Sequence, residues 1–271
     1  MTARPELPGF ADDDAGQARD PQFATTLARG IDILLAYRVG ESLLGNKDFA
    51  ERTGLSRPTV ARLTHTLTTL GYLRRDAAQG KYRLGAAVLT AGYSLLAGMH
   101  VRQIAQPLMK ALANELGGAV SLGLRDRISM VYVETARSTD RLRYTPDIGA
   151  TLPILTTAIG RAWLCRAPVR ERDETLNRLK LADPEGYARF AAQFARIRSA
   201  FEQNGFCSCR AEWREDVYAF AVPLSRVLDG RLFVVNCAIP AQQKTFSALE
   251  REAAPRLVAL VQELEARLGM R

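Results

Sequence analysis

The spacing of apolar residues changes several times along this chain and predicts an α+β protein built in two parts. Near the N-terminus the spacing is helical, and two short alternating runs follow. The second part mixes strands with helices, so we expect an antiparallel sheet with helices before and after its strands. The expected helices cover residues 25–40, 46–70 (as a helix pair), 86–97, 101–116, 156–163, 168–181, 184–204 and 249–268. The expected strands cover 71–75, 81–84, 119–124, 128–135, 141–144, 206–211, 217–224 and 231–238.

Residues 46–70 carry the most informative pattern in the sequence. Ala50 and Gly54 stand at the spacing of a helix-turn-helix, in which the crossing helices need a small residue and the turn needs positive φ. We expect the side-chain oxygen of Ser56 to cap the second helix. Pro58 fits the first turn of that helix, where a missing amide hydrogen costs nothing.

The outward positions of the second helix hold cations and hydroxyls, and no carboxylate interrupts them. Such a surface suits phosphates and base edges, whereas an ordinary helical hairpin of a bundle usually mixes in Glu and Asp. The bundle hairpin stays open as an alternative at this point. The outward residues are Arg57, Thr59, Arg62, Thr64, His65, Thr66 and Thr68.

The alternating runs at 71–75 and 81–84 predict a hairpin beside the helix pair. Its cations would contact backbone phosphates next to the groove that holds the second helix, which is the role of a wing. A solvated edge hairpin without a partner is the alternative. The four cations are Arg74, Arg75, Lys81 and Arg83.

The net charge of +8 is unevenly distributed. Residues 23–85 hold ten Lys and Arg against five Asp and Glu, a net +5, whereas residues 1–22 hold two against five, a net −3. The excess over 23–85 suits an anionic partner, although a solvated surface could carry it too. We find neither a secretory signal nor the run of about 18 apolar residues that a membrane span needs, so we expect a cytoplasmic chain without a membrane partner.

The residues that most often carry catalysis or bind metals are few. Four cysteines, Cys165, Cys207, Cys209 and Cys237, are too sparse for a disulfide framework, and the two histidines lie far from them. We therefore expect free thiols, no metal and no cofactor. The usual hydrolase, dinucleotide, phosphate-loop and zinc-protease motifs do not occur, so we expect no enzyme. An enzyme that uses only paired carboxylates stays open, because such pairs leave no local signature.

Several separate stretches resemble the IclR family of bacterial transcriptional regulators, from about residue 23 to the C-terminus. Each stretch is weak alone, but their order and spacing are specific. They are RGIDIL (29–34), GLSRPTVARL (54–63), LGYL (70–73), YRLG (82–85), IGATLP (148–153), TAIGRA (157–162) and NGF (204–206).

The resemblance implies a winged helix-turn-helix, a linker helix that dimerises, and a GAF-like effector domain related to PAS folds. It also implies a homodimer or a dimer of dimers on near-palindromic operators in double-stranded DNA, with a small organic acid altering that binding. We accordingly expect a flexible tail, a DNA-binding domain, a linker helix and an effector-binding domain. Their ranges are 1–22, 23–85, 86–100 and 101–271.

The resemblance also implies which residues face each ligand. Ser56, Arg57, Pro58, Thr59 and Arg62 would face DNA together with the wing cations. The effector pocket would lie between the sheet and the turn and helix that follow the Leu-Pro motif, where backbone amides suit a carboxylate. The positions matched to this pocket are Leu152, Pro153, Thr156, Thr157, Ala158, Cys209, Ala219, Asn236 and Ala238.

Two departures from the family pattern bear on the effector. Relatives that sense very small acids tend to carry Asp, Ser or Cys at pocket positions where this chain has Ala219 and Ala238. Trp213 and the run 217–220 replace a Gly-rich segment. Both departures favour a larger carboxylate, such as an aromatic one, although an aromatic residue of this kind more often belongs to the core than to a ligand pocket.

Two further alternatives keep the DNA-binding N-terminal part and give the C-terminal part a different role. Cys207 and Cys209 stand two residues apart on an expected strand, so their side chains point the same way and could form a redox trigger. The second half could instead serve only for dimerisation and bind no ligand.

Overall fold

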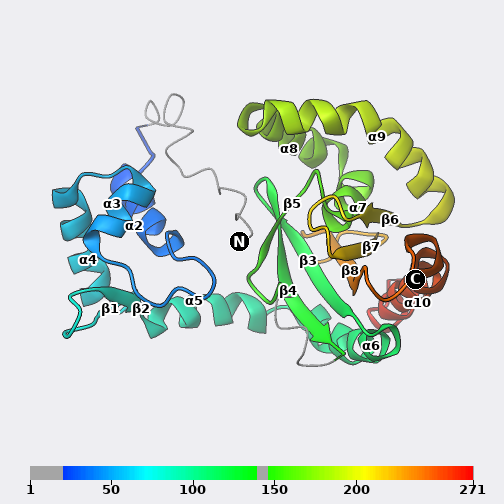
Figure 1. Ribbon diagram of the computed structural model, residues 1–271, viewed down its shortest axis with the longest axis horizontal. Helices are drawn as coiled ribbons and strands as arrows, with labels where there is room; N and C mark the ends of the chain where they lie inside the picture. Colours follow the sequence, from blue (N-terminus) through cyan, green and yellow to red (C-terminus); the bar gives the residue numbers. More distant parts are fainter. Residues whose placement is uncertain (1–20, 139–145, 271) are drawn as a thin grey trace. The chain divides into compact units, whose positions relative to one another are not determined.

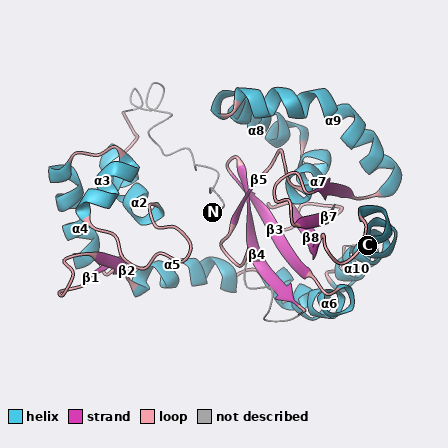
Figure 2. Ribbon diagram, in the orientation of Figure 1, coloured by secondary structure: helices cyan, strands magenta, loops and turns pink. Residues whose placement is uncertain are grey.

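The computed structural model describes residues 21–138 and 146–270; the strand expected at 141–144 lies outside this range. The described residues form two compact units, with the division after Gly98. Figure 1 gives the order of the elements and Figure 2 their type. Helices and antiparallel strands are both present in each unit, which confirms the expected α+β class.

The N-terminal unit consists of a helix cluster, a two-stranded antiparallel hairpin and a final helix (Figure 1). Helices α2, α3 and α4 contact one another, and β1 contacts α4. The elements are α2 (Thr25–Leu35), α3 (Asn46–Thr53), α4 (Arg57–Thr69), β1 (Leu73–Arg75), β2 (Tyr82–Leu84) and α5 (Ala86–Ala97).

Aromatic side chains join the hairpin to the helices of this unit. The rings of Tyr37 and Phe49 meet edge to face at 5.7 Å, and both residues belong to one buried cluster with Ile33. The Tyr37 hydroxyl donates a hydrogen bond to the backbone oxygen of Tyr82 at 2.8 Å, and burial raises the pKa of Tyr37 to about 12. Leu44 adds two backbone hydrogen bonds to Tyr82, so Tyr37 and Leu44 both hold the hairpin at Tyr82.

The helix-turn-helix has the expected turn but a different cap. Gly54 has a φ of 69°, the left-handed conformation that the turn requires, and Pro58 lies in the first turn of α4. The prediction that the Ser56 oxygen caps the α4 backbone is wrong, because that oxygen lies 2.9 Å from the Thr59 hydroxyl and makes no cap hydrogen bond. The first helix is also shorter than expected, since α2 ends at Leu35.

Thr64 does not belong to the outward face of α4, contrary to the sequence prediction. Its side chain is fully buried, and its hydroxyl donates to the backbone oxygen of Val60 at 2.9 Å. A buried threonine can satisfy its hydroxyl within its own helix, so a threonine in a polar stretch need not face solvent.

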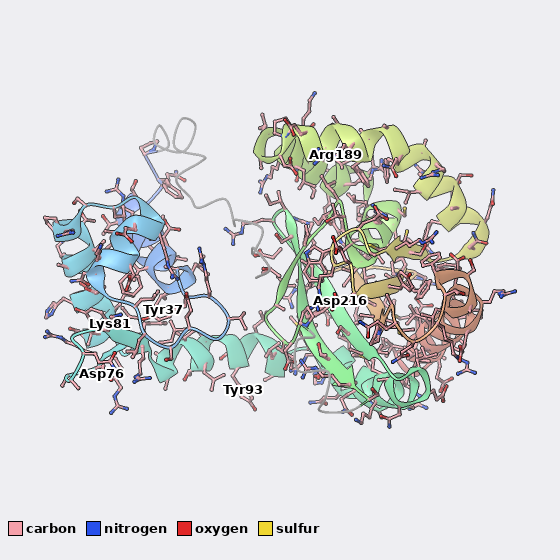
Figure 3. All side chains as sticks on the ribbon, in the orientation of Figure 1. Tyr37, Asp76, Lys81, Tyr93, Arg189 and Asp216 are labelled. Carbon is pink, nitrogen blue, oxygen red and sulfur yellow. The ribbon has the colours of Figure 1, made fainter. Side chains whose placement is uncertain are left out.

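Helix α5 has apolar side chains that the rest of the described chain leaves exposed. None of its twelve residues is buried within the described chain, and Leu89, Tyr93 and Leu95 are 75%, 67% and 50% exposed. Figure 3 labels Tyr93 on this helix. Among the described helices, α5 included, none combines the length and the apolar character that a bilayer crossing demands.

The C-terminal unit is a six-stranded antiparallel sheet with helices on both faces. The strand order is β5-β4-β3-β8-β7-β6, so β5 and β6 form opposite edges. Strand β5 was not expected from the sequence. The strands are β3 (Ala119–Asp126), β4 (Ser129–Arg137), β5 (Thr151–Pro153), β6 (Cys207–Arg210), β7 (Val217–Pro223) and β8 (Phe233–Pro240). The helices are α6 (His100–Leu116), α7 (Ala158–Arg166), α8 (Val169–Ala182), α9 (Pro184–Asn204) and α10 (Phe246–Arg267).

Strand register assigns each residue of the sheet to one of two faces. Phe220 pairs with Cys237, and the Phe220 ring stacks on Phe246 of α10 at 5.7 Å, so this row faces α10. The next row pairs Ala221 with Asn236; Ala221 belongs to the core cluster that includes α7 residues. Helices α6 and α10 therefore cover one face and α7 the other, with α9 packed against α7 (Figure 2).

The buried face of α6 does not simply follow its large apolar residues. These residues recur at Ile104, Leu108, Leu112 and Leu116, but only Leu112 and Leu116 are buried, while Ile104 and Leu108 are half buried. Ala105 and Met109 are fully buried in their place. A small residue such as Ala105 lets the helix approach the sheet closely, and a pattern built on large residues misses it.

Two glycines permit the close approach of α7 to the sheet. A Cβ atom at Gly160 would lie 2.2 Å from the backbone oxygen of Ile154, and one at Gly123 would lie 2.7 Å from the Ile159 side chain. Real Cβ atoms do not approach backbone this closely, so α7 could keep its place only with glycine at residue 160.

We expect Gly160→Ala to lower the free energy of unfolding by about 1–3 kcal/mol, because the new methyl group forces α7 away from the turn before it. The matched control is Gly92→Ala in α5, where no described atom lies within 4 Å of the added Cβ. Thermal unfolding followed by circular dichroism measures both variants. Equal effects of the two substitutions would contradict the close packing of α7.

Candidate functional site

The first candidate site is the outward surface of α4. Ser56, Arg57 and Pro58 are exposed at the start of the helix, and Arg62 is exposed one turn later. Thr59 is half buried and precedes Arg62 by three positions, so the two share a face. Since α4 contains no carboxylate, its outward face combines positive charge with hydroxyl groups.

The hairpin places two arginines directly opposite each other. Arg74 pairs with Arg83 in the antiparallel register, so both side chains project from one face of the hairpin. Like charges at such positions repel, and the Asp76 carboxylate offsets part of the repulsion through an ion pair with Arg83 at 3.1 Å. Arg83 also keeps the pKa of Asp76 below its usual range. One acid cannot balance two guanidinium groups, so this face suits an external anion.

The remaining wing cations lie on the same small hairpin. Arg75 is exposed and pairs with Tyr82, while Lys81 is half buried beside the turn (Figure 3). Strand β1 contacts α4, so the wing lies directly beside this helix in the N-terminal unit.

The second candidate site lies on the face of the sheet that α7 covers. Cys209, Ala219 and Ala238 form a continuous row across β6, β7 and β8, because the register pairs Ala219 with both of the others. Asn236 lies in the next row on the same face. These four positions, predicted from separate strands, are therefore brought together by the fold.

The turn after β5 carries the other predicted positions to this face. Leu152 and Pro153 belong to β5 at the far edge of the sheet, yet the backbone oxygen of Thr156 accepts a hydrogen bond from the Cys209 thiol at 3.2 Å. Thr157 caps α7 by accepting from the Gly160 amide at 3.3 Å and donates its own hydroxyl to Pro153 at 2.6 Å. The Thr157 hydroxyl thus orders the turn.

Ala158 follows directly as the first residue of α7 and is fully buried. Leu152 is also buried, whereas Pro153 and Thr156 are half buried. Pro153 and Thr156 are therefore the partly accessible residues of this turn, and the buried Leu152 and Ala158 anchor it in the core.

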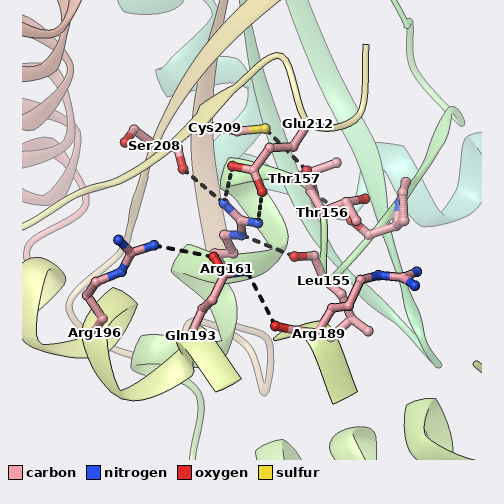
Figure 4. Close-up of polar contacts among 11 residues, drawn as sticks. Leu155, Thr156, Thr157, Arg161, Arg189, Gln193, Arg196, Ser208, Cys209 and Glu212 are labelled. Carbon is pink, nitrogen blue, oxygen red and sulfur yellow. Dashed lines mark hydrogen bonds and ion pairs between the residues drawn. The ribbon is translucent and has the colours of Figure 1, made fainter. Parts of the chain in front are cut away.

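Arg161 fastens this turn to β6 and to the segment that follows it. Its guanidinium donates to the backbone oxygen of Leu155 at 3.1 Å and forms a two-pronged ion pair with Glu212, one contact of which is 2.7 Å (Figure 4). A weaker contact reaches the Ser208 oxygen at 3.5 Å. Arg161 also holds the pKa of Glu212 below its usual range. Arg161 was not predicted as a site residue, although it lies within the TAIGRA stretch (157–162).

Three further polar residues on the same face, Tyr132, Ser121 and Thr135, were not predicted from the sequence. The Asn236 amide donates to the Tyr132 hydroxyl at 2.8 Å, and the hydroxyls of Ser121 and Thr135 lie 3.1 Å apart. Ser121 pairs with Asn236 in the sheet, so the polar groups form one patch beneath α7. Burial raises the pKa of Tyr132, which keeps its hydroxyl protonated. Polar residues at alternate strand positions were the available signal, but their partners are distant in sequence.

The cysteines are arranged differently from the predicted trigger. Cys207 and Cys209 do share a face of β6, but the nearest sulfur described for Cys207 is that of Cys165, at 3.8 Å. Burial raises the pKa of Cys209, and its thiol is engaged by Thr156. This geometry does not favour a Cys207–Cys209 pair. All four cysteines are free thiols.

Comparison with known protein families covers most of the chain. The family model of the IclR helix-turn-helix domain matches residues 26–77, and that of the bacterial transcriptional regulator IclR C-terminal domain matches residues 93–265. Both matches describe parts of transcriptional regulators, and no enzymatic family is indicated.

Individual relatives agree with the family models. The HTH-type transcriptional regulator TsaQ1/TsaQ2 of Comamonas testosteroni is 33% identical over 245 residues, which cover 90% of this chain and 88% of that protein. The p-hydroxybenzoate hydroxylase transcriptional activator of Acinetobacter baylyi is 27% identical over 229 residues, covering 82% and 83%.

Solved structures share the fold. An IclR family transcriptional regulator from Brucella abortus matches with a TM-score of 0.79 and 38% identity, over 92% of this chain and 94% of that one. An IclR homologue from Microbacterium hydrocarbonoxydans, crystallised with 4-hydroxybenzoate, matches with a TM-score of 0.65 and 20% identity, over 88% and 99%.

We expect Glu212→Gln to lower the free energy of unfolding of the C-terminal unit by about 1 kcal/mol at neutral pH. The value is modest because the Glu212 side chain is 41% exposed, which weakens the ion pair. Urea unfolding followed by tryptophan fluorescence measures this unit, since Trp163 and Trp213 are the only tryptophans in the sequence. Glu215→Gln, in the same segment, is the control.

The loss of unfolding free energy in Glu212→Gln should depend on pH. Because the folded-state pKa of Glu212 is lowered, its carboxylate stabilises the fold fully above the unfolded pKa of about 4.3, and the effect fades as pH falls through the folded value. The difference between wild type and Glu212→Gln should therefore shrink below about pH 4. A difference that stays constant into stronger acid would show that charge on Glu212 is not its cause.

Proposed function

Because this chain belongs to the IclR family of bacterial transcriptional regulators, we propose that it binds a near-palindromic operator in double-stranded DNA and that a small organic acid modulates this binding. The DNA-binding domain spans residues 23–85, a linker that contains helix α5 spans 86–100, and the effector-binding domain spans 101–271. Residues 1–22 precede the DNA-binding domain.

The arrangement of charge on the helix and the wing carries the proposal. Helix α4, which contains no carboxylate, lies next to a hairpin in which the side chains of Arg74 and Arg83 project from the same face. Arg57, Thr59 and Arg62 would contact base edges or phosphates in the major groove, with Ser56 and Pro58 at its edge. The wing cations would neutralise phosphates and thus set affinity more than specificity.

The uncovered face of α5 supports assembly as a homodimer or a dimer of dimers. A helix with Leu89, Tyr93 and Leu95 exposed gains free energy when a second copy removes those side chains from water. Paired chains would present two α4 helices to successive major grooves, with half-site centres about 34 Å apart or a multiple of that distance.

The effector would bind on the face of the sheet that α7 covers. Its carboxylate would meet the turn at Pro153, Thr156, Thr157 and Ala158, and its body would meet the row of Cys209, Ala219 and Ala238 with Asn236. Small apolar side chains in that row favour a bulky ligand over a very small acid. Two relatives add weight to an aromatic acid, since one was crystallised with 4-hydroxybenzoate and another is the p-hydroxybenzoate hydroxylase transcriptional activator.

The effector acts on DNA binding only if it binds one arrangement of the two DNA-binding domains better than another. Leu152 belongs to β5, directly before the turn, so ligand contacts there would be transmitted to the sheet. Operator DNA should change effector affinity by the same factor as the effector changes operator affinity.

The first test is replacement of Arg62 by Ala. We expect affinity for the chain's own upstream DNA to fall by roughly tenfold to a hundredfold, with an unchanged unfolding midpoint, because Arg62 is exposed and makes its contact only with DNA. Fluorescence anisotropy on native and shuffled DNA across salt concentrations measures it. Arg189→Ala, an exposed cation on α9 (Figure 3), is the control. Equal binding of both DNAs by wild type would refute sequence recognition.

The second test fills the proposed effector site. We expect 4-hydroxybenzoate to raise the unfolding midpoint of the wild type and to have no such effect on Ala238→Leu, whose larger side chain would occupy the ligand's place. Ala195→Leu, at an exposed position on α9, should respond like the wild type. A shift with aliphatic acids alone would contradict the aromatic preference, and a shift that survives in Ala238→Leu would place the ligand elsewhere.

A further inference from the structure

Two thiols far apart in sequence lie side by side in the C-terminal unit. The Sγ atoms of Cys165, in α7, and Cys207, in β6, are 3.8 Å apart, although 42 positions separate the residues. Cys165 is half buried and Cys207 is buried. Neither residue belongs to the proposed operator-binding or effector-binding positions, so the pair has no role in the function proposed above.

We propose that Cys165 and Cys207 form an oxidisable pair, in which a hydroperoxide converts the two thiols to an intramolecular disulfide. The sulfur atoms must close to about 2.0 Å, which requires a movement of less than 2 Å shared between a helix end and an edge strand. Strand β6 lies at the edge of the sheet, so one of its sides is free of strand partners that would resist such a shift.

The surroundings assign a different role to each thiol. The contact between the two sulfur atoms, aided by the positive charge of Arg198, lowers the pKa of Cys165. The same contact and burial raise the pKa of Cys207. The thiolate is the reactive form, so Cys165, which is also the more exposed of the two, reacts first. Cys207 then resolves the product.

The chemistry balances with the hydroperoxide as the only co-reactant. The Cys165 thiolate attacks one peroxide oxygen, the O–O bond breaks, and the departing oxygen leaves as hydroxide or alkoxide while Cys165 becomes a sulfenic acid. The Cys207 sulfur then attacks the Cys165 sulfur; the S–O bond breaks, and the Cys207 proton leaves with the hydroxyl group as water. Two thiols lose two electrons, and the peroxide gains them.

The disulfide would join the two elements that border the proposed effector positions. Helix α7 begins directly after the turn that includes Thr156, and β6 carries Cys209, whose thiol contacts that turn. A covalent link between Cys165 and Cys207 would fix the spacing of this helix and this strand. The pair needs neither operator nor effector in order to react.

The test oxidises the reduced full-length protein with hydrogen peroxide, blocks the remaining thiols, and maps the peptides without reduction. We expect two of the four thiols to be lost, a mass decrease of two hydrogen atoms, and a cross-linked peptide that joins Cys165 to Cys207. Dithiothreitol should reverse the change. This measurement uses wild-type protein, so it does not depend on any variant folding correctly.

Three serine variants separate the roles. Cys165→Ser should form no disulfide; Cys207→Ser should accumulate a sulfenic acid at Cys165 that dimedone traps. Cys209→Ser, on the same strand and the same face, is the matched control and should still form the Cys165–Cys207 link.

A cross-link between Cys207 and Cys209, a link only between different chains, or survival of all four thiols at peroxide concentrations that oxidise free cysteine would overturn the proposal. Dimedone labelling of Cys207 in Cys165→Ser at the rate seen for Cys165 in Cys207→Ser would overturn the assignment of roles.

Discussion

Helix α7 lies against the sheet at a distance that glycine permits, and much of the C-terminal unit depends on this contact. Gly160 meets the backbone of Ile154, and Gly123 meets the side chain of Ile159. The close approach fixes where the turn before α7 crosses the sheet, and so where the Thr156 oxygen meets Cys209. Side chains on one face of β6, β7 and β8 thereby come to share a region with a turn that follows the opposite edge strand.

Buried polar groups on that face are satisfied by partners from other elements. Arg161 links α7 to Leu155 and to Glu212, while Asn236 on β8 donates to Tyr132 on β4. An unpaired polar group in such surroundings would cost about 1–3 kcal/mol, so each contact specifies one arrangement of the turn and the strands. A ligand that binds on this face would act on elements that are already connected to one another.

In the N-terminal unit, the fold holds several cations close together on a small hairpin. Tyr37 and Leu44 fix the hairpin through hydrogen bonds to Tyr82, and this leaves Arg74 and Arg83 opposite each other. Repulsion between them is a cost in the free chain that a phosphate would relieve. Neutral residues would make the hairpin more stable and would remove its use in binding an anion.

The sequence by itself determined the elements and the class of the protein. Periodicity located the helices and nearly all the strands within a few residues, because side-chain burial follows the helical or strand repeat along the chain. The turn glycine Gly54, the proline at residue 58 and the ordered motifs were local features, and the family comparisons confirmed the regulator class that they predicted.

Tertiary structure alone decided which distant residues meet. The inward turn of Thr64, the burial of Ala105 and Met109 in α6, the Arg161–Glu212 ion pair and the Cys165–Cys207 pair all depend on packing between elements. A repeat in the sequence specifies which face of an element is buried, but it does not specify which side chain of another element lies opposite. That choice depends on strand register and on how closely two backbones can approach, and both are properties of the folded chain.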